Sequence, residues 1–469
     1  MNQPQTGAAI APDAAGAPVK ADTARPAKVQ LDSRARWGIL AMLFIVTTIN
    51  YADRATISIA GPEIRRVFDL TPVEMGYIFS AFGWSYVLAQ LPGGWLLDRF
   101  GSKVTYFFSI FLWSLFTLMQ GAIGFFAGGA AVAALICLRL LVGAAEAPSF
   151  PGNSRITSAW FPTHERGLAA AIFNSAQYFA TVLFAPIMGW MVHEHGWESV
   201  FFVMGGLGIL VAALWLKVIH SPKAHPSISK SELSYIEEGG GLVHLDAGQG
   251  AAKKAAQVDT WACIKELLSS RMLLGVYIGQ YCITTLTYFF LTWFPVYLVT
   301  ERHMTILKAG FVASLPAVAG FLGGVFGGWL SDRLTRRGCS LSVARKTPIV
   351  FGMLMSMSMI ACNYISTDAL VIAIMSLAFF GKGVGALGWA VVADTSPKEA
   401  GGLSGSLFNT FGNTAGITTP IVIGYIVQAT GSFAGALVYV AACAALAIAC
   451  YLFVVGDIKR VTLTKSIRN

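Results

Sequence analysis

Charged residues are scarce in this 469-residue sequence: Asp, Glu, Lys and Arg make up 12% of it, whereas 55% is hydrophobic. A soluble protein carries about twice that charged fraction. The apolar residues come in runs of about 20 or more, without an amphipathic pattern. Such a run, rising about 1.5 Å per residue in a helix, crosses a hydrocarbon core of about 30 Å. The composition therefore excludes an ordinary soluble protein and predicts an all-α polytopic membrane protein.

Signatures of cofactor chemistry are also missing. The seven cysteines show no metal or redox spacing, and the seven histidines are scattered, so we expect no metal site and no disulfide framework. The ATP-binding pattern G-x-x-x-x-G-K-[ST] does not occur. Residues 383–388 match G-x-G-x-x-G, but no strand precedes them, so close helix contact or bending is the better interpretation. The sequence predicts neither an enzyme nor a bound cofactor.

The net charge of +9 lies in loops and tails, where it indicates membrane topology and not nucleic-acid binding. Residues 1–30 are rich in Ala, Pro and Gly and lack the apolar core of a signal peptide. We therefore predict a disordered cytoplasmic tail over residues 1–36.

Twelve apolar stretches are long enough to span a membrane. They are Trp37–Ala60, Met75–Leu97, Val104–Phe126, Gly128–Phe150, Gly167–Val192 and Val200–Ile219, then Met272–Val299, Ala309–Leu330, Pro348–Ile365, Ala369–Ala393, Gly402–Val427 and Phe433–Val455. These stretches predict bundles at 37–219 and 272–456, a cytoplasmic central loop at 220–271 and a tail at 457–469. In the loop, Ser229–Glu232 and Ser234–Glu237 have the capping-box pattern of a short surface helix.

Lys and Arg in the short loops predict the orientation, because cytoplasmic loops carry an excess of them. One set of loops holds Arg34, Arg36, Arg99, Lys103, Arg155, Arg166, Arg333, Arg336, Arg337, Arg345 and Lys346. The opposite set holds few basic residues, and acidic neighbours offset two of them. Both termini are therefore expected in the cytoplasm.

The chain repeats itself at about half its length. Residues 93–99 (GGWLLDR) recur as 327–333 (GGWLSDR), an offset of 234. At an offset of 235, Gly167, Leu168, Phe173 and Asn174 recur as Gly402, Leu403, Phe408 and Asn409. Two blocks at nearly one offset predict two pseudo-symmetric six-helix bundles in the same orientation, which is a transporter architecture with a site between the halves.

Five ionisable residues lie inside the predicted spans: Asp53, Arg54, Arg139, Glu146 and Lys382. Each costs about 3 kcal/mol at mid-depth on insertion scales, and such residues usually mark a transport path. For Asp53 and Arg54, an ion pair that merely joins two helices is the alternative. Arg139 and Glu146 are two turns apart on one face, about 10.5 Å along the axis. Their partners therefore lie elsewhere, and Asp53 and Arg54 are the available ones.

Several motifs carry a family resemblance. Gly94–Lys103 resembles the G-x-x-x-D-R-x-G-x-K loop of the major facilitator superfamily, and Gly328–Arg333 is a decayed copy. Asn50–Arg54 (NYADR), Ala145–Pro151 (AEAPSFP) and Glu165–Gly167 (ERG) resemble the anion:cation symporter family. Within that family, the chain from about Trp37 to Arg460 resembles bacterial transporters of glucarate and galactarate. The resemblance implies a twelve-helix transporter in the bacterial inner membrane that moves a sugar-acid anion with protons, and we expect a monomer.

The resemblance also assigns roles to individual residues. It implies that Asp53 and Glu146 carry or sense the proton. It places Tyr51, Arg54, Tyr86, Gln177, Trp389 and Asn409 in the sugar-acid site, and Gln280, Tyr281 and Asn413 are further candidates of lower rank. Helix–helix hydrogen bonding is the alternative for each amide, and packing is the alternative for Trp389. Arg139 is expected to tune Glu146, with a purely structural role as the alternative.

A dicarboxylate sugar acid is a dianion at neutral pH. The five intramembrane groups, three bases and two acids, carry +1 when both acids are ionised and +3 when both are protonated. Protonation therefore makes the site more attractive to the dianion, as a proton–anion symporter requires. Our hypothesis is that Arg54 holds one carboxylate and Lys382, from the other half, holds the second.

The resemblance further implies a cytoplasmic gate at Asp98 and Arg99, with Asp332 and Arg333 in the second copy; helix capping is the alternative. Symport of a related anion (a hexonate, a hexuronate or glycerate) remains open. An efflux antiporter is disfavoured because residues 185–190 (APIMGW) depart from the G-P-x-x-G-G pattern of such proteins.

Overall fold

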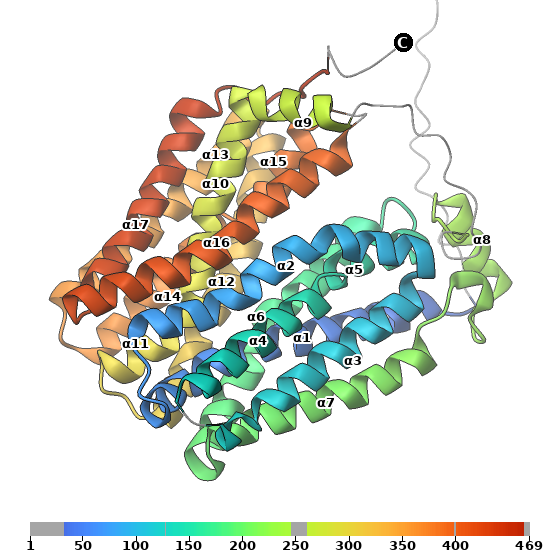
Figure 1. The fold of residues 1–469 in the computed structure, drawn as a ribbon. Coiled ribbons are helices and arrows are strands. Elements are labelled where there is room, and N and C mark those ends of the chain that lie inside the picture. The colour runs from blue at the N-terminus through green and yellow to red at the C-terminus, as the bar shows by residue number, and fades with distance from the viewer. Residues whose placement is uncertain (1–31, 127, 245–259, 398–399, 464–469) are drawn as a thin grey trace, which may run out of the picture.

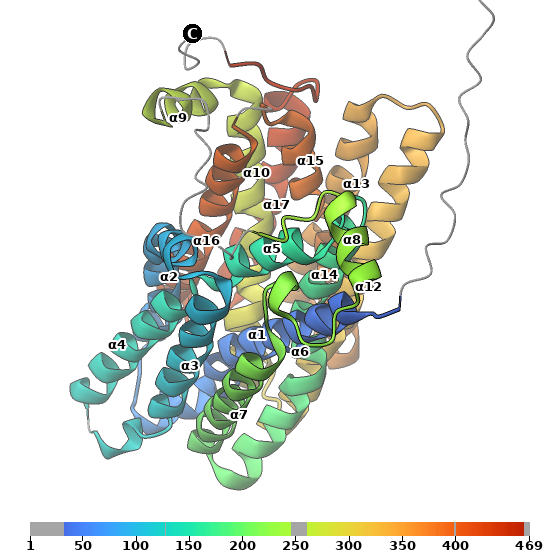
Figure 2. The same ribbon diagram turned by 90° about the vertical axis from the view of Figure 1, so that its right-hand side faces the viewer.

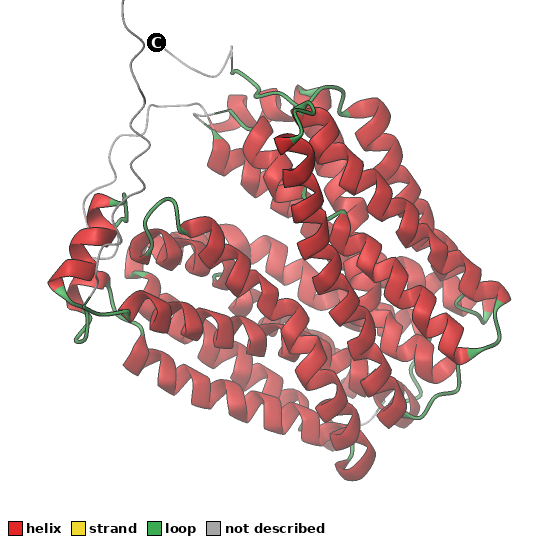
Figure 3. Ribbon diagram, turned by 180° about the vertical axis from the view of Figure 1, so that it is seen from behind, coloured by secondary structure: helices red, strands yellow, loops and turns green. Residues whose placement is uncertain are grey.

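The computed structural model describes residues 32–126, 128–244, 260–397 and 400–463, and within these ranges regular structure is entirely helical (Figure 3). The N-terminal half contains α1 (Ala35–Val67), α2 (Pro72–Phe100), α3 (Ser102–Gln120), α4 (Gly129–Glu146), α5 (Ser149–Trp160), α6 (Arg166–His195) and α7 (Trp197–Val218). The central region contains α8 (Lys230–Glu238) and α9 (Thr260–Ser269). The C-terminal half contains α10 (Arg271–Tyr288), α11 (Phe294–Thr300), α12 (Ile306–Arg336), α13 (Leu341–Ser356), α14 (Asp368–Val384), α15 (Gly388–Thr395), α16 (Gly401–Thr430) and α17 (Ala434–Ala449).

The twelve predicted spans are confirmed as helical segments in two bundles (Figure 1). By length and composition alone, ten segments of the described chain could cross a membrane. The other two spans are α2 and α16, of 29 and 30 residues. These two helices pack against each other between the bundles, and α6 packs against α12 in the same way.

Six predicted spans are not continuous α-helices. The third and ninth end in 3-10 helices, Ile123–Phe125 and Met357–Tyr364, and the twelfth ends in a π-helical stretch, Cys450–Val454. The fourth breaks after Glu146, where Pro148 lacks the N–H that would continue the ladder, and resumes as α5 to Trp160. The seventh contains a π-helical stretch, Phe289–Trp293, between α10 and α11. The tenth breaks at residues 385–387, between α14 and α15.

The glycine run of the tenth span serves helix packing, as the sequence analysis expected. A side chain at Gly383 would overlap the backbone carbonyl of Gly320 on α12. A side chain at Gly381 would overlap that of Gly352 on α13. Glycine at these positions lets three helices approach backbone to backbone beside Lys382.

The two bundles meet closely at one end of the molecule only. At the end remote from α8 and α9, a Cβ on Gly76 would lie 2.7 Å from the carbonyl oxygen of Pro420. There the hydroxyls of Tyr77 and Tyr425 are 3.1 Å apart. At the other end, which we call the linker end, Cβ atoms on the repeat glycines Gly94, Gly167, Gly328 and Gly402 would meet no atom of the described residues within 4 Å. The bundles are therefore closed at the remote end and separated at the linker end.

At the linker end α8 docks on the N-terminal half, whereas α9 packs against α10 and α16 of the C-terminal half (Figure 2). α1 has no side-chain cap of its own, and Glu232 of α8 supplies one by accepting from the backbone N–H groups of Ala35 and Arg36 at 2.9 and 3.2 Å. The Arg36 side chain bridges Glu232 and Glu165, each at 3.0 Å. Burial alone would raise the pKa of Glu232, but these hydrogen bonds and one from Ser33 hold that pKa below its usual range.

The structure corrects the predicted capping boxes of the central loop and the predicted end of the N-terminal tail. The capping pattern at Ser229 is half right: Ser229 caps α8 by accepting from the Glu232 N–H, but the Glu232 side chain turns to α1. The pattern at Ser234 is wrong as a cap, because Ser234 lies inside α8. Residues 32–36, which the sequence analysis assigned to the disordered tail, are held against α8, whereas residues 1–31 of that predicted tail lie outside the described ranges.

Candidate functional site

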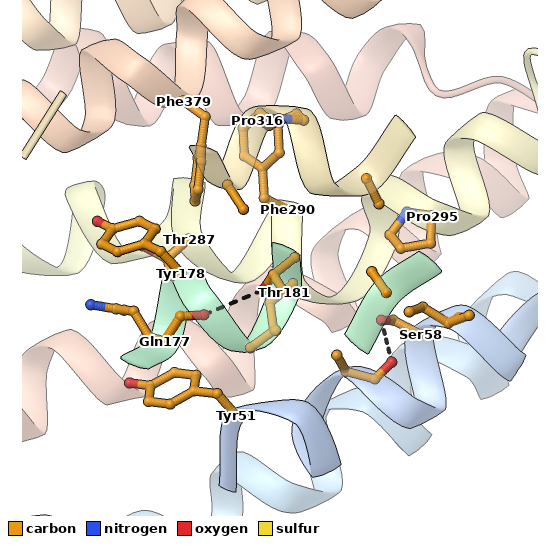
Figure 4. A pocket seen from close by; sticks show the side chains of 16 residues that line it. Tyr51, Ser58, Gln177, Tyr178, Thr181, Thr287, Phe290, Pro295, Pro316 and Phe379 are labelled. Atoms are coloured by element: carbon orange, nitrogen blue, oxygen red, sulfur yellow. Dashed lines mark hydrogen bonds between the residues drawn. The ribbon is translucent and has the colours of Figure 1, made fainter. Parts of the chain in front are cut away.

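A cavity of about 60 Å³ lies between the two halves. α1 and α6 form its N-terminal wall, and α12, α14 and the segment 287–295 form its C-terminal wall. Its polar lining residues include Tyr51, Gln177 and Tyr178, whose polar ends point to the same side in Figure 4. The lining residues carry no charge. Of the predicted substrate residues, Tyr51 and Gln177 therefore line this cavity directly.

Arg54 and Glu146 form a buried ion pair behind Tyr51. The Arg54 Nε donates to Glu146 Oε2 at 2.7 Å, and the two side chains are 6% and 0% exposed. The guanidinium also lies 4.7–5.0 Å from the ring centroids of Tyr51, Phe82 and Tyr86. This pairing confirms the expectation that Glu146 finds its partner on the first span.

The pair leaves hydrogen-bonding capacity unused. The Arg54 Nη2 and Glu146 Oε1 atoms are buried and have no hydrogen-bond partner within the described part of the chain. A carboxylate from a ligand could therefore take the free edge of the guanidinium, or could replace Glu146 on it.

Asp53 sits on a different face of α1 from the cavity. Tyr51, Ala55 and Ser58 of α1 line the cavity, whereas Asp53 is 1% exposed and points into the N-terminal bundle. Neither of its carboxylate oxygens has a hydrogen-bond partner among the described residues. The Trp113 indole N–H lies beside this carboxylate and interacts with it, but outside ordinary hydrogen-bond geometry. A carboxylate without an ion pair at this depth is costly when ionised, and within the described ranges Asp53 forms no salt bridge that would join two helices.

Arg139 lies in the same enclosed region of the N-terminal half, 3% exposed, with its guanidinium 5.3 Å from the Phe82 ring centroid. It is within electrostatic range of both Glu146 and Asp53. Tyr86 is 2% exposed and stacks on Phe82 at 5.3 Å, so it contacts Arg54 from behind the cavity.

Lys382, on α14, is a buried charged residue of the C-terminal half. It is 6% exposed, and its Nζ donates a long hydrogen bond of 3.4 Å to the Tyr178 hydroxyl on α6. Its ammonium also lies 5.2 Å from the Phe379 ring centroid. No acidic residue pairs with Lys382 within the described ranges. The structure thus places Arg54 and Lys382 on opposite sides of the cavity region, one from each half.

The other C-terminal candidates have partners within their own half. Gln280 donates to Thr284 at 3.2 Å, Tyr281 bonds Thr418 at 2.7 Å, and Asn413 donates to Asn409 at 3.1 Å. Trp389 stacks edge-on against Phe408 and is 57% exposed on the linker-end side of the helix break. In this conformation none of these residues lines the cavity.

The predicted gate residues contact their own halves. Asp98 pairs with Arg155 of α5 at 2.5 Å, and Arg99 lies over Trp95. Arg333 lies over Trp329, and Asp332 is exposed. These contacts fit the separation of the bundles at the linker end.

Two tyrosines at the site were missed by the sequence analysis. Tyr178 lines the cavity and accepts from Lys382 across the halves. Tyr288 of α10 donates to Asn413 and lies within electrostatic range of Arg54 and Tyr86. Tyr178 directly follows the predicted Gln177, but sequence gives no reason to prefer it over other tyrosines in apolar spans.

Two six-helix bundles around a central cavity, with buried charges on both sides, define a secondary transporter. The profile of the Major Facilitator Superfamily matches residues 43–344, and the chain belongs to this family. It is therefore a transport protein and not an enzyme.

Several proteins of similar sequence are named as transporters of sugar acids. The chain is 63% identical over 435 residues to a probable galactarate/D-glucarate transporter of Escherichia coli (strain K12), covering 93% of this chain and 96% of that one. It is 64% identical to a probable galactarate/D-glucarate transporter of Bacillus subtilis (strain 168), covering 92% and 94%. A D-galactonate transporter of Escherichia coli O6:H1 is 44% identical, covering 93% and 99%. Among solved structures, a D-xylose-proton symporter shares the fold, with a TM-score of 0.68 at 14% identity over 92% of this chain and 100% of that one.

Proposed function

We propose that this protein is a proton-coupled symporter that takes up a sugar-acid dianion, D-glucarate or D-galactarate, by alternating access. The names of the 63–64% identical relatives support the substrate. The observation that carries the mechanism is the buried Arg54–Glu146 pair in one half, facing Lys382 in the other, which has no acidic partner among the described residues.

Glu146 and a substrate carboxylate compete for one guanidinium in this proposal. While Glu146 is ionised, it holds Arg54 at 2.7 Å. A protonated, neutral Glu146 loses the charge attraction, so Arg54 becomes available to a carboxylate of the substrate. Proton binding and anion binding then favour each other, which is the thermodynamic requirement for symport.

Asp53 is the second proton site in the proposal. It is buried beside the pair with no ion-pair partner in the described part of the chain, and carrying a proton removes the cost of a buried charge. Arg139, within range of both acids, tunes their charge. Tyr51, Gln177, Tyr86 and, once the halves close, Trp389 and Asn409 hydrogen-bond or stack on the sugar-acid chain.

The proposal extends to topology. The linker end is cytoplasmic, both termini lie in the cytoplasm, and the protein works as a monomer in the bacterial inner membrane. The described conformation is then open inward, with Gly76 and Tyr77 packed at the periplasmic side. Asp98, Arg99, Asp332 and Arg333 close the cytoplasmic side in the alternate state. The bundles are 37–219 and 272–456, joined by the loop 220–271.

The 44% identity to a D-galactonate transporter supports one alternative, symport of a monocarboxylate hexonate. Lys382 favours the diacid, because a second carboxylate compensates its charge and a terminal hydroxyl does not.

The test is a competition uptake panel of hexarates, hexonates and hexuronates in intact cells, with and without a protonophore. We expect hexarates to compete best, uptake to collapse with the protonophore, and the medium to become alkaline on substrate addition. Uptake that is insensitive to the protonophore and causes no alkalinisation would refute proton symport.

A further inference from the structure

The contact between Tyr178 and Lys382 joins the two halves at the cavity. Tyr178 is on α6 and Lys382 on α14, 204 residues apart in sequence, and the ammonium donates to the phenol oxygen at 3.4 Å. That distance is longer than an ordinary hydrogen bond, and a neutral phenol compensates a buried ammonium poorly. Lys382 therefore keeps most of its capacity to bind an anion.

Tyr178 is fixed in place by its surroundings. Its ring packs edge-on against Phe379 and Phe321, each at 6.3 Å between centroids. Gly320 of α12 lies against the same ring, since a Cβ there would come within 3.0 Å of Tyr178. The hydroxyl is thus held at the cavity beside Gln177 (Figure 4), within 3.4 Å of the Lys382 ammonium.

We propose that Tyr178 and Lys382 together form the recognition site for the second carboxylate and that Tyr178 determines specificity for diacids over monoacids. This inference rests on the proposed sugar-acid transport. The Lys382 ammonium donates to one carboxylate oxygen, and the Tyr178 hydroxyl, released from Lys382, turns its proton to the other. A hexonate presents a hydroxymethyl group at that position, which cannot accept two such hydrogen bonds with a full negative charge.

The lining of the cavity supports this assignment. No carboxylate of the described residues lines it, so no acidic side chain of that lining competes with the substrate for Lys382. Arg54, by contrast, already has Glu146 as its partner. The two ends of the substrate therefore meet chemically different sites: a proton-controlled site at Arg54, and a site at Lys382 and Tyr178 that reads only the presence of a second carboxylate.

The test is Tyr178→Phe, which keeps the ring and removes the hydroxyl. Initial uptake rates of labelled D-glucarate and of D-gluconate, its monocarboxylate counterpart, are measured in proteoliposomes with an imposed pH gradient. We expect kcat/KM for glucarate to fall about 10-fold or more, since a hydrogen bond to a charged group is lost, and that for gluconate to change by less than about 2-fold. Tyr451→Phe is the matched control, because the buried Tyr451 hydroxyl has no partner among the described residues and lies away from the cavity.

Adding Lys382→Gln, alone and combined with Tyr178→Phe, gives a double-mutant cycle. In that background, Tyr178→Phe should reduce glucarate transport much less than in the wild type, because the two side chains act on one carboxylate. Equal losses for both substrates in Tyr178→Phe, or unchanged selectivity, would overturn the assignment while leaving wild-type symport intact. Failure of the wild type to transport glucarate would instead overturn the proposed function, and this inference with it.

Discussion

Glu146→Gln tests the competition at the centre of the proposed mechanism. The substitution keeps the shape of the side chain and removes its charge, so Arg54 loses its ionic partner at 2.7 Å. A net charge-assisted hydrogen bond of this kind is worth about 1.5–3 kcal/mol. A substrate carboxylate that must displace ionised Glu146 forfeits that amount, which corresponds to about 10-fold to 150-fold in Kd.

The competition also predicts how the substrate affinity changes with pH. In the wild type, binding of the anion requires Glu146 to take up a proton, so glucarate affinity should weaken by up to about tenfold per pH unit as pH rises. In Glu146→Gln the competitor is always neutral. Its affinity should stay near the low-pH wild-type value from pH 6 to pH 8, and the variant should exchange substrate without accumulating it.

Isothermal titration calorimetry of the purified protein at three pH values measures the affinities, and counterflow and proton-driven uptake in proteoliposomes separate exchange from accumulation. Glu165→Gln is the control, since Glu165 also pairs with an arginine, Arg36 at 3.0 Å, but lies near the linker. Removing one partner of a buried pair can cost about 3–5 kcal/mol of stability. A loss of that size could unfold part of the sample and lower the apparent substrate affinity. The three aromatic rings around Arg54 offset part of that cost, and thermal unfolding checks it. Wild-type pH dependence of Kd in Glu146→Gln would refute the competition.

Three further substitutions test other parts of the structure. Asp53→Asn should bind and exchange hexarate but fail to accumulate it; accumulation at the wild-type level under a pH gradient would rule out Asp53 as a coupling site. Glu232→Gln should destabilise the protein by about 2 kcal/mol, because hydrogen bonds to a charge are weakened. Since the pKa of Glu232 is depressed, its contribution is present above the unfolded pKa and is lost as pH falls through the folded value. Denaturant unfolding at pH 7 and below pH 4 should therefore show the variant and wild type converge in acid, and a constant difference would contradict this. Gly76→Ala should loosen the closed end, because its Cβ would lie 2.7 Å from the Pro420 carbonyl, and shift the population toward a form that is open at that end. Spin-label distances between the bundle ends measure that shift, and an unchanged distribution would count against the tight contact.

Helix breaks show where sequence reasoning reached its limit in the fold. The twelve spans followed from run lengths, because each span must satisfy its own backbone hydrogen bonds in lipid. The break at Pro148 was visible in principle, since proline interrupts the ladder. The break at residues 385–387 was less so, because it depends on how closely α12, α13 and α14 pack at their glycines.

For the candidate site, the sequence identified the charged residues but not their contacts. Buried charges stand out against apolar spans because they are expensive there, so Asp53, Arg54, Glu146 and Lys382 were identifiable one by one. Their contacts were not, because neighbours on a helix point about 100° apart, and only packing decides which faces the cavity.

The sequence alone therefore determined the twelve spans, the two-fold repeat and the set of buried charges, since each depends on local composition or on a direct comparison of segments. Only the tertiary structure decided that Arg54 meets Glu146 across 92 residues, that Asp53 turns away from the cavity, and that Tyr178 reaches Lys382 across 204. Those contacts arise from the packing of helices whose relative rotation no single span encodes.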